Sequence, residues 1–103
     1  MNPFQFEPEL FSYRASVIEI LNRAGYEWPT HFNSIDLIHD RFGLEVCGIA
    51  EKRDALGMLR ILRQALREWR FYHLSYKERG RDTGWKVVIH REPDTDIGPG
   101  QLV

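Results

Sequence analysis

Apolar residues recur at helical spacing near the start of the chain. Pro8 is at a position where the first turn of a helix tolerates proline, and Gly25 can adopt the left-handed conformation that ends a helix. This pattern predicts a helix over residues 9–24, preceded by an N-terminal arm over residues 1–8. The apolar positions with helical spacing are Leu10, Val17, Leu21 and Ala24.

A shorter helical pattern follows after an aromatic connector. Asn33 or Ser34 can cap a second helix, and Gly43 can end it. The apolar residues expected on one side of this helix are Ile35, Ile38 and Phe42. The next stretch, "LEVCGIAEKR" at 44–53, has few apolar residues and fits a short strand, a loop or the entry to a helix, so these interpretations stay open.

The strongest helical pattern begins after Asp54, a plausible N-cap. Its apolar stripe consists of Leu59, Leu62, Leu66 and Trp69, and is broadened by Met58, Ile61 and Ala65. At about 100° per residue, four arginines fall within roughly 80° of one another, nearly opposite this stripe. They are Arg60, Arg63, Arg67 and Arg70. The segment therefore predicts a helix with one apolar and one cationic side.

A β-hairpin is predicted at the end of the domain. The stretches "FYHLSY" at 71–76 and "WKVVIH" at 85–90 are rich in aromatic and β-branched residues. The polar segment 77–84 between them contains two glycines that suit a turn. Its basic residues are Lys77, Arg79 and Arg81. The expected fold class is therefore α+β, with three helices followed by a C-terminal β-hairpin in a single domain over residues 1–91.

This order of elements resembles the winged-helix family of DNA-binding domains over residues 9–91. The segment "SIDLIHDRFG" at 34–43 stands where that family has its first helix-turn-helix helix, and "RGRDTGWKVVI" at 79–89 stands where it has its wing. The resemblance implies that the helix before the hairpin enters the major groove, while the wing touches the DNA backbone or the minor groove. It assigns these contacts to Arg60, Arg63, Arg67 and Arg70 on the helix, and to Lys77, Arg79 and Arg81 on the hairpin.

The formal net charge of -1 conceals a strong asymmetry along the chain. Residues 1–51 carry three basic and eight acidic side chains, whereas residues 52–91 carry eleven basic and four acidic ones. The segment 92–103 adds three acidic residues, and its proline and glycine content predicts a flexible acidic tail. This distribution indicates an anionic partner, or a homodimer in which basic and acidic surfaces meet.

Composition limits the location of the protein. Its one cysteine, Cys47, cannot form an internal disulfide, so a reducing cytoplasm is the expected compartment. The longest aliphatic run, at 87–89, is far shorter than a membrane span, and the first ten residues lack the basic and apolar regions of a secretion signal. We therefore expect no membrane partner.

Candidate catalytic groups are isolated along the sequence. Glu45 and Glu51 lie near Cys47 and would raise the pKa of its thiol, which disfavours a nucleophilic role. His39 has acidic neighbours, but no second histidine at the spacing of a zinc motif accompanies it. We therefore expect a non-enzymatic protein without a metal or cofactor.

Two functional hypotheses remain. The first is a small nucleic-acid-binding or regulatory protein that uses the arginine helix face and the basic hairpin tip, with duplex DNA as the first candidate ligand. The alternative is a protein-interaction module, an adaptor or inhibitor, that docks its basic face on an acidic protein surface. The arginines can also be a solvated helix face, or be paired with acidic neighbours.

Overall fold

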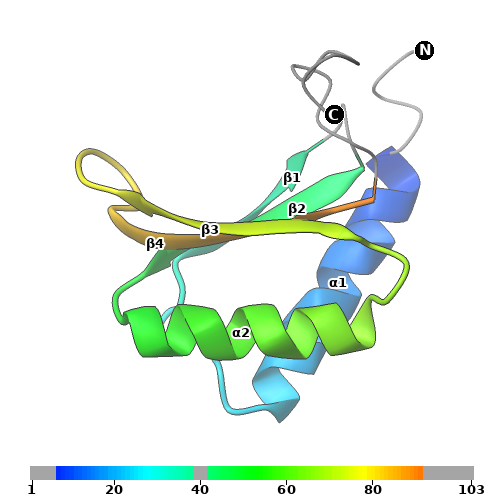
Figure 1. The fold of residues 1–103 in the computed structure, drawn as a ribbon, viewed down its shortest axis with the longest axis horizontal. Helices are drawn as coiled ribbons and strands as arrows, with labels where there is room; N and C mark the ends of the chain where they lie inside the picture. The colour runs from blue at the N-terminus through cyan, green and yellow to red at the C-terminus, as the bar shows by residue number, and fades with distance from the viewer. Residues whose placement is uncertain (1–6, 39–41, 92–103) are drawn as a thin grey trace, which may run out of the picture.

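In the part of the chain that the structure describes, two helices lie on one side of a four-stranded antiparallel sheet (Figure 1). This computed structural model describes residues 7–38 and 42–91. The sheet order is β1-β2-β4-β3, so β2 and β4 are central and β1 and β3 form the two edges. In chain order the elements are α1 (Glu7–Arg23), β1 (Ser34–Ile38), β2 (Gly43–Ile49), α2 (Lys52–Ala65), β3 (Phe71–Lys77) and β4 (Gly84–His90).

The core lies between the helices and one face of the sheet. Because side chains alternate along a strand, Val46 and its β4 partner Val87 point to the same face, as do Leu44 and Ile89. All four are fully buried. They pack in one cluster with the buried residues of the helices, which are Leu10, Val17 and Leu21 of α1 and Ala55, Met58 and Leu62 of α2. The sheet therefore has a helix-covered face and an opposite face on which no described helix packs.

The predicted fold of three helices and a hairpin is wrong. The segment expected to form the second helix instead forms β1 and the beginning of β2, with residues 39–41 of that segment outside the described part. Ile35 is buried against the core, while Asp36 is exposed, which is the alternation of a strand. Pairing of Ile35 with Val46 buries this short segment more effectively than an isolated helix of about ten residues could.

The stretch 44–53, for which a strand, a loop and a helix entry were all considered, contains a strand, a short connection and the start of a helix. Its first part belongs to β2, which ends at Ile49, and α2 begins at Lys52 after the N-cap Glu51. Gly48 has a φ of 71° and is the extra residue in a β-bulge where the register with β4 shifts. A side chain at Gly48 would collide with Asn33, so glycine is required at this position of the bulge.

The helix predicted over residues 9–24 is present as α1, with bounds shifted by one or two residues. In contrast, α2 ends at Ala65, with Leu66 as its C-cap. The apolar stripe nevertheless continues into the core beyond the helix, because a turn from Leu66 places Trp69 against Phe42, with ring centroids 5.6 Å apart. Helical spacing thus persists in the sequence for several residues after the helix has ended.

The predicted hairpin is present as β3 and β4, but it forms half of a larger sheet rather than a separate wing. Its register pairs Tyr72 with Ile89, Leu74 with Val87 and continues without a shift to Lys77 and Gly84. Neither described helix has the length and apolar character needed to cross a membrane.

Candidate functional site

Three of the four predicted arginines converge on one surface depression. Arg60, Arg63 and Arg67, together with Gln64, line a shallow pocket of about 340 Å³, which we call the arginine pocket. Arg60, Arg63 and Gln64 lie on the last turns of α2, while Arg67 comes from the connection that follows it. All four side chains are exposed, and no carboxylate lines the pocket. The depression can therefore accept an anion without displacing an acidic group of the described residues.

One arginine of the pocket is held by an aromatic ring. The guanidinium carbon of Arg63 lies 4.1 Å from the ring centroid of Tyr72 on β3, a cation–π contact that restricts the long side chain. Arg60 and Arg67 form no ion pair with any residue in the described parts of the chain. The interpretation that acidic neighbours neutralise this helix face thus finds no support among residues 7–38 and 42–91.

Arg70 does not belong to the arginine pocket. It is exposed in the connection to β3 and is absent from the pocket lining. The sequence-based prediction grouped Arg70 with the other three arginines because it extended the helix to residue 70. In the structure the helix ends at Ala65. Sequence reasoning also missed Tyr72, which it treated only as one of the aromatic residues of the predicted strand "FYHLSY".

The basic hairpin tip forms a second, separate surface. Lys77, Arg79 and Arg81 are all exposed at the β3–β4 connection. In Figure 1 this connection lies beyond the end at which α2 begins, whereas Arg67 follows the opposite end of the helix. The 14 residues of α2 correspond to about 21 Å, so the tip and the arginine pocket are well separated.

The hairpin tip is attached to the beginning of β1. Asp82 accepts hydrogen bonds from the Asn33 amide and, at 3.4 Å, from the Ser34 hydroxyl. Asp82 has a φ of 62°, a left-handed conformation that aspartate tolerates in turns. This carboxylate is thereby engaged within the chain, which leaves Glu78 as the other acidic side chain of the connection at 78–83.

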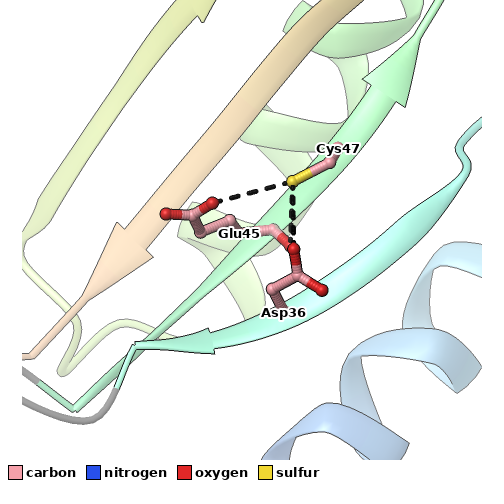
Figure 2. Close-up of side chains that lie close together, drawn as sticks. All are labelled: Asp36, Glu45 and Cys47. Atoms are coloured by element: carbon pink, nitrogen blue, oxygen red, sulfur yellow. Dashed lines mark hydrogen bonds between the residues drawn. The ribbon is translucent and has the colours of Figure 1, made fainter. Parts of the chain in front are cut away.

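A second cluster of polar groups lies on the sheet face opposite the helices. Figure 2 shows Cys47 between the carboxylates of Asp36 and Glu45. The sulfur lies 3.8 Å from Asp36 Oδ2 and 3.7 Å from Glu45 Oε2, within reach of weak thiol hydrogen bonds. Burial, followed by the negative charges of Glu45 and Asp36, raises the pKa of the thiol to about 12. Cys47 is therefore protonated at neutral pH and is a poor nucleophile.

The same cluster contains potential metal ligands. One potential ligand atom from each of Asp36, Glu45 and Cys47 lies within 4.8 Å of the others. A metal bound here would have to displace the thiol proton, so its binding would depend on pH. Lys86 Nζ also lies 3.7 Å from Glu45 Oε2 and competes for that carboxylate. His39, the histidine with acidic neighbours, lies outside the described residues.

An apolar pocket of about 480 Å³ lies between α1 and the outer edge of β1. Two of its lining side chains bind the backbone of this edge: Arg14 Nε donates to the Ile35 carbonyl and Trp28 Nε1 donates to the Asn33 carbonyl, both at 2.8 Å. These two side chains are therefore engaged in covering the edge of β1, a role that no sequence pattern indicated.

Comparisons with known proteins return no match: neither protein-family models, nor curated proteins, nor solved structures resemble the chain significantly.

Proposed function

We propose that this protein is a small non-enzymatic nucleic-acid-binding protein whose arginine pocket contacts the phosphate backbone. The observation that carries the proposal is the convergence of Arg60, Arg63 and Arg67 on one pocket without a carboxylate in its lining. The proposal includes action in the reducing cytoplasm, in keeping with a single cysteine in the chain.

The chemistry of the pocket suits phosphate. A guanidinium group donates two parallel hydrogen bonds to a phosphate, and each neutralised phosphate releases condensed counterions. Arg60 and Arg63 lie three residues apart on α2, which brings their Cβ atoms within about 5–6 Å, and Arg67 joins them in the pocket lining from the connection after the helix. Several contacts to one stretch of backbone are therefore sterically compatible.

Duplex DNA is the first candidate ligand because the two basic surfaces are far apart. The hairpin tip, with Lys77, Arg79 and Arg81, lies beyond the end at which α2 begins, and Arg67 follows the other end, so the helix, about 21 Å long, lies between them. A separation of about 21 Å corresponds to roughly six phosphates along one strand of a duplex. A duplex is long enough to span this separation, whereas a small anion can occupy only one of the two surfaces.

A protein-interaction module remains the alternative because aromatic and aliphatic side chains accompany the arginines. Tyr72, beside the pocket, is 39% exposed, and Leu56 of α2 is 45% exposed. Tyrosine and arginine are enriched in protein interfaces, so an acidic protein surface could use the same residues.

The experiment is a fluorescence anisotropy titration of labelled 20-base-pair and single-stranded DNA at about 50 and 200 mM salt. We expect duplex binding that weakens steeply with salt, because counterion release dominates phosphate recognition. Arg60→Gln should weaken binding to all sequences and reduce the salt slope by about one. Arg23→Gln is the matched control, since it removes one charge from an exposed position on the other helix.

Three outcomes would contradict the proposal. Absence of binding at 50 mM salt would exclude the nucleic-acid function and favour the acidic protein partner. Equal losses in Arg60→Gln and Arg23→Gln would show that net charge, and not the arginine pocket, is responsible. Loss of cooperative unfolding in Arg60→Gln would show that this arginine has a structural role.

A further inference from the structure

The two edges of the sheet are protected to different degrees. At β1, the carbonyls of Asn33 and Ile35 accept hydrogen bonds from Trp28 and Arg14, so part of the outward backbone is occupied. At β3, no described strand lies beyond the edge, and alternate residues direct their N–H and C=O groups outward. The strand contains no proline and no bulge, two devices that prevent edge-to-edge pairing, and its one lysine, Lys77, is the last residue of the strand.

Exposed apolar side chains gather at this unprotected edge. Among the described residues, four of the six exposed large hydrophobic side chains belong to β3 or α2. They are Phe71 (40% exposed), Tyr72 (39%), Tyr76 (53%) and Leu56 (45%). The two tyrosines point to the helix-covered face, because they pair with Ile89 and Trp85, and Phe71 points to the opposite face. The edge is therefore apolar on the helix-covered face, while on the opposite face Phe71 is followed by His73, Ser75 and Lys77.

Leu56 extends this surface onto α2. It is four residues after Lys52 and seven before Arg63, intervals that place the three side chains on one side of the helix. Lys52 contacts the ring of Trp85, which packs against Tyr76, and Arg63 contacts the ring of Tyr72. This side of α2 therefore lies along β3, and Leu56 contributes to the same exposed patch.

We infer that β3 pairs antiparallel with β3 of a second copy of the chain, giving a two-fold dimer with a continuous eight-stranded sheet. This inference goes beyond the proposed function and does not depend on nucleic-acid binding.

The sequence of β3 is complementary to itself in this arrangement. Full antiparallel overlap of the seven residues places the two-fold axis at Leu74. Tyr72 then lies opposite the partner's Tyr76, so each dimer contains two such aromatic pairs, a favourable cross-strand combination. Phe71 lies opposite the partner's Lys77, where a cation–π contact can form. No pair of like charges lies directly opposite in this register.

Nearby cations do not prevent the pairing. In this register the two copies of Tyr72, each beneath an Arg63, are four positions apart along the paired strands, or about 13 Å. This distance exceeds the Debye length of about 8 Å at physiological ionic strength, so repulsion between the two Arg63 groups is strongly screened.

Sedimentation equilibrium over about 1 to 500 µM protein, without nucleic acid, tests the inference. We expect reversible dimerisation, and an increase of at least about tenfold in the dimer dissociation constant for Tyr76→Lys, which removes the aromatic pair and puts a second cation beside the partner's Tyr72, whose ring Arg63 already contacts. Phe11→Lys is the matched control, because Phe11 is 52% exposed on α1, away from β3. Phe71→Lys is a second test, since it places lysine opposite the partner's Lys77 and remains informative if Tyr76→Lys fails to fold.

Hydrogen exchange of the β3 amides identifies the interface. Protection that increases with protein concentration in β3 supports the inference. A monomer throughout the concentration range would overturn it, as would a dimer that Tyr76→Lys and Phe71→Lys leave unchanged. A chain that stays monomeric but gains β3 protection on addition of a poly-glutamate peptide would also overturn it, and would assign the edge to an acidic peptide.

Discussion

At the scale of single residues, Cys47 illustrates how surroundings decide the chemistry of a side chain. It is buried on the sheet face opposite the helices, and two carboxylates lie within 4 Å of its sulfur. Both burial and these charges favour the neutral thiol over the thiolate. The sequence indicated Glu45 as one source of this effect, but the second charge comes from Asp36 across the β1–β2 pairing rather than from Glu51.

We expect native Cys47 to react with iodoacetamide much more slowly than the same thiol in the urea-unfolded chain at pH 8, because its pKa is about 12 when folded. Asp36→Asn should lower the pKa and increase the native alkylation rate, whereas Lys86→Met should raise it and decrease the rate. Mass spectrometry of the alkylated protein measures both. A native rate equal to the unfolded rate would contradict the assignment.

The same pKa shift predicts a direction for stability against pH. The folded state retains the thiol proton to a higher pH than the unfolded chain, whose thiol has a pKa near 9. The stabilising contribution is thus complete below pH 9 and is lost as pH rises from about 9 towards 12. Urea unfolding of the native chain and Cys47→Ala at pH 8 and 10 checks this sign, since the variant should lose less stability between these pH values.

At the scale of secondary-structure elements, α2 shows how an amphipathic helix divides its roles. Leu62 is fully buried in the core, while Gln64 two residues later is exposed beside the arginine pocket. We expect Leu62→Ala to lower the free energy of unfolding by about 2–5 kcal/mol, because it removes buried methyl groups and leaves a cavity. Gln64→Ala should change it by less than about 0.5 kcal/mol. Urea denaturation followed by circular dichroism measures both, and equal effects would contradict the packing of α2.

Sequence patterns anticipated the elements whose signal is long and periodic. Residues 9–24 carry a stripe that only a helix satisfies, and the β-branched and aromatic runs of β3 and β4 left little alternative to a hairpin. The prediction of a helix over 34–43 was wrong because two patterns fit the segment equally well. Ile35, Ile38 and Phe42 fit helical spacing, while Ile35 and Leu37 fit strand alternation. Its pairing partner, Val46, lies beyond the segment, so local pattern could not decide between the two.

The sequence predicted part of the candidate site, because part of it depends on spacing along one segment of the chain. Spacing along one helix brought Arg60, Arg63 and Arg67 together, and the structure places them around one pocket. It could not reveal that the helix ends before Arg70, nor that Tyr72 on β3 lies beneath Arg63. Contacts between elements depend on how the sheet packs against the helix, and this information is not local in sequence.

At the scale of the whole molecule, the order of the strands determines how strongly their backbone amides are protected from hydrogen exchange. Central strands are hydrogen-bonded on both sides, and β4 carries the fully buried Val87 and Ile89. We expect amides of β4 to exchange slowest in hydrogen-exchange measurements at low protein concentration. The outward amides of the edge strands β1 and β3 should exchange faster than the amides of β2 and β4, because no described strand pairs with either outer edge. Uniform exchange across the four strands would contradict this arrangement.

The order β1-β2-β4-β3 also divides the chain into two units of the same design. Each consists of a helix followed by a hairpin, α1 with β1 and β2, and α2 with β3 and β4, and each supplies one edge strand and one central strand. The antiparallel seam between β2 and β4 relates the units as halves of a pseudo-symmetric whole. The molecule thus consists of two helix–hairpin units that are joined by one antiparallel strand pair. Pairing of β3 with β3 of a second copy would join two chains in the same way that β2 and β4 join the two units of one chain.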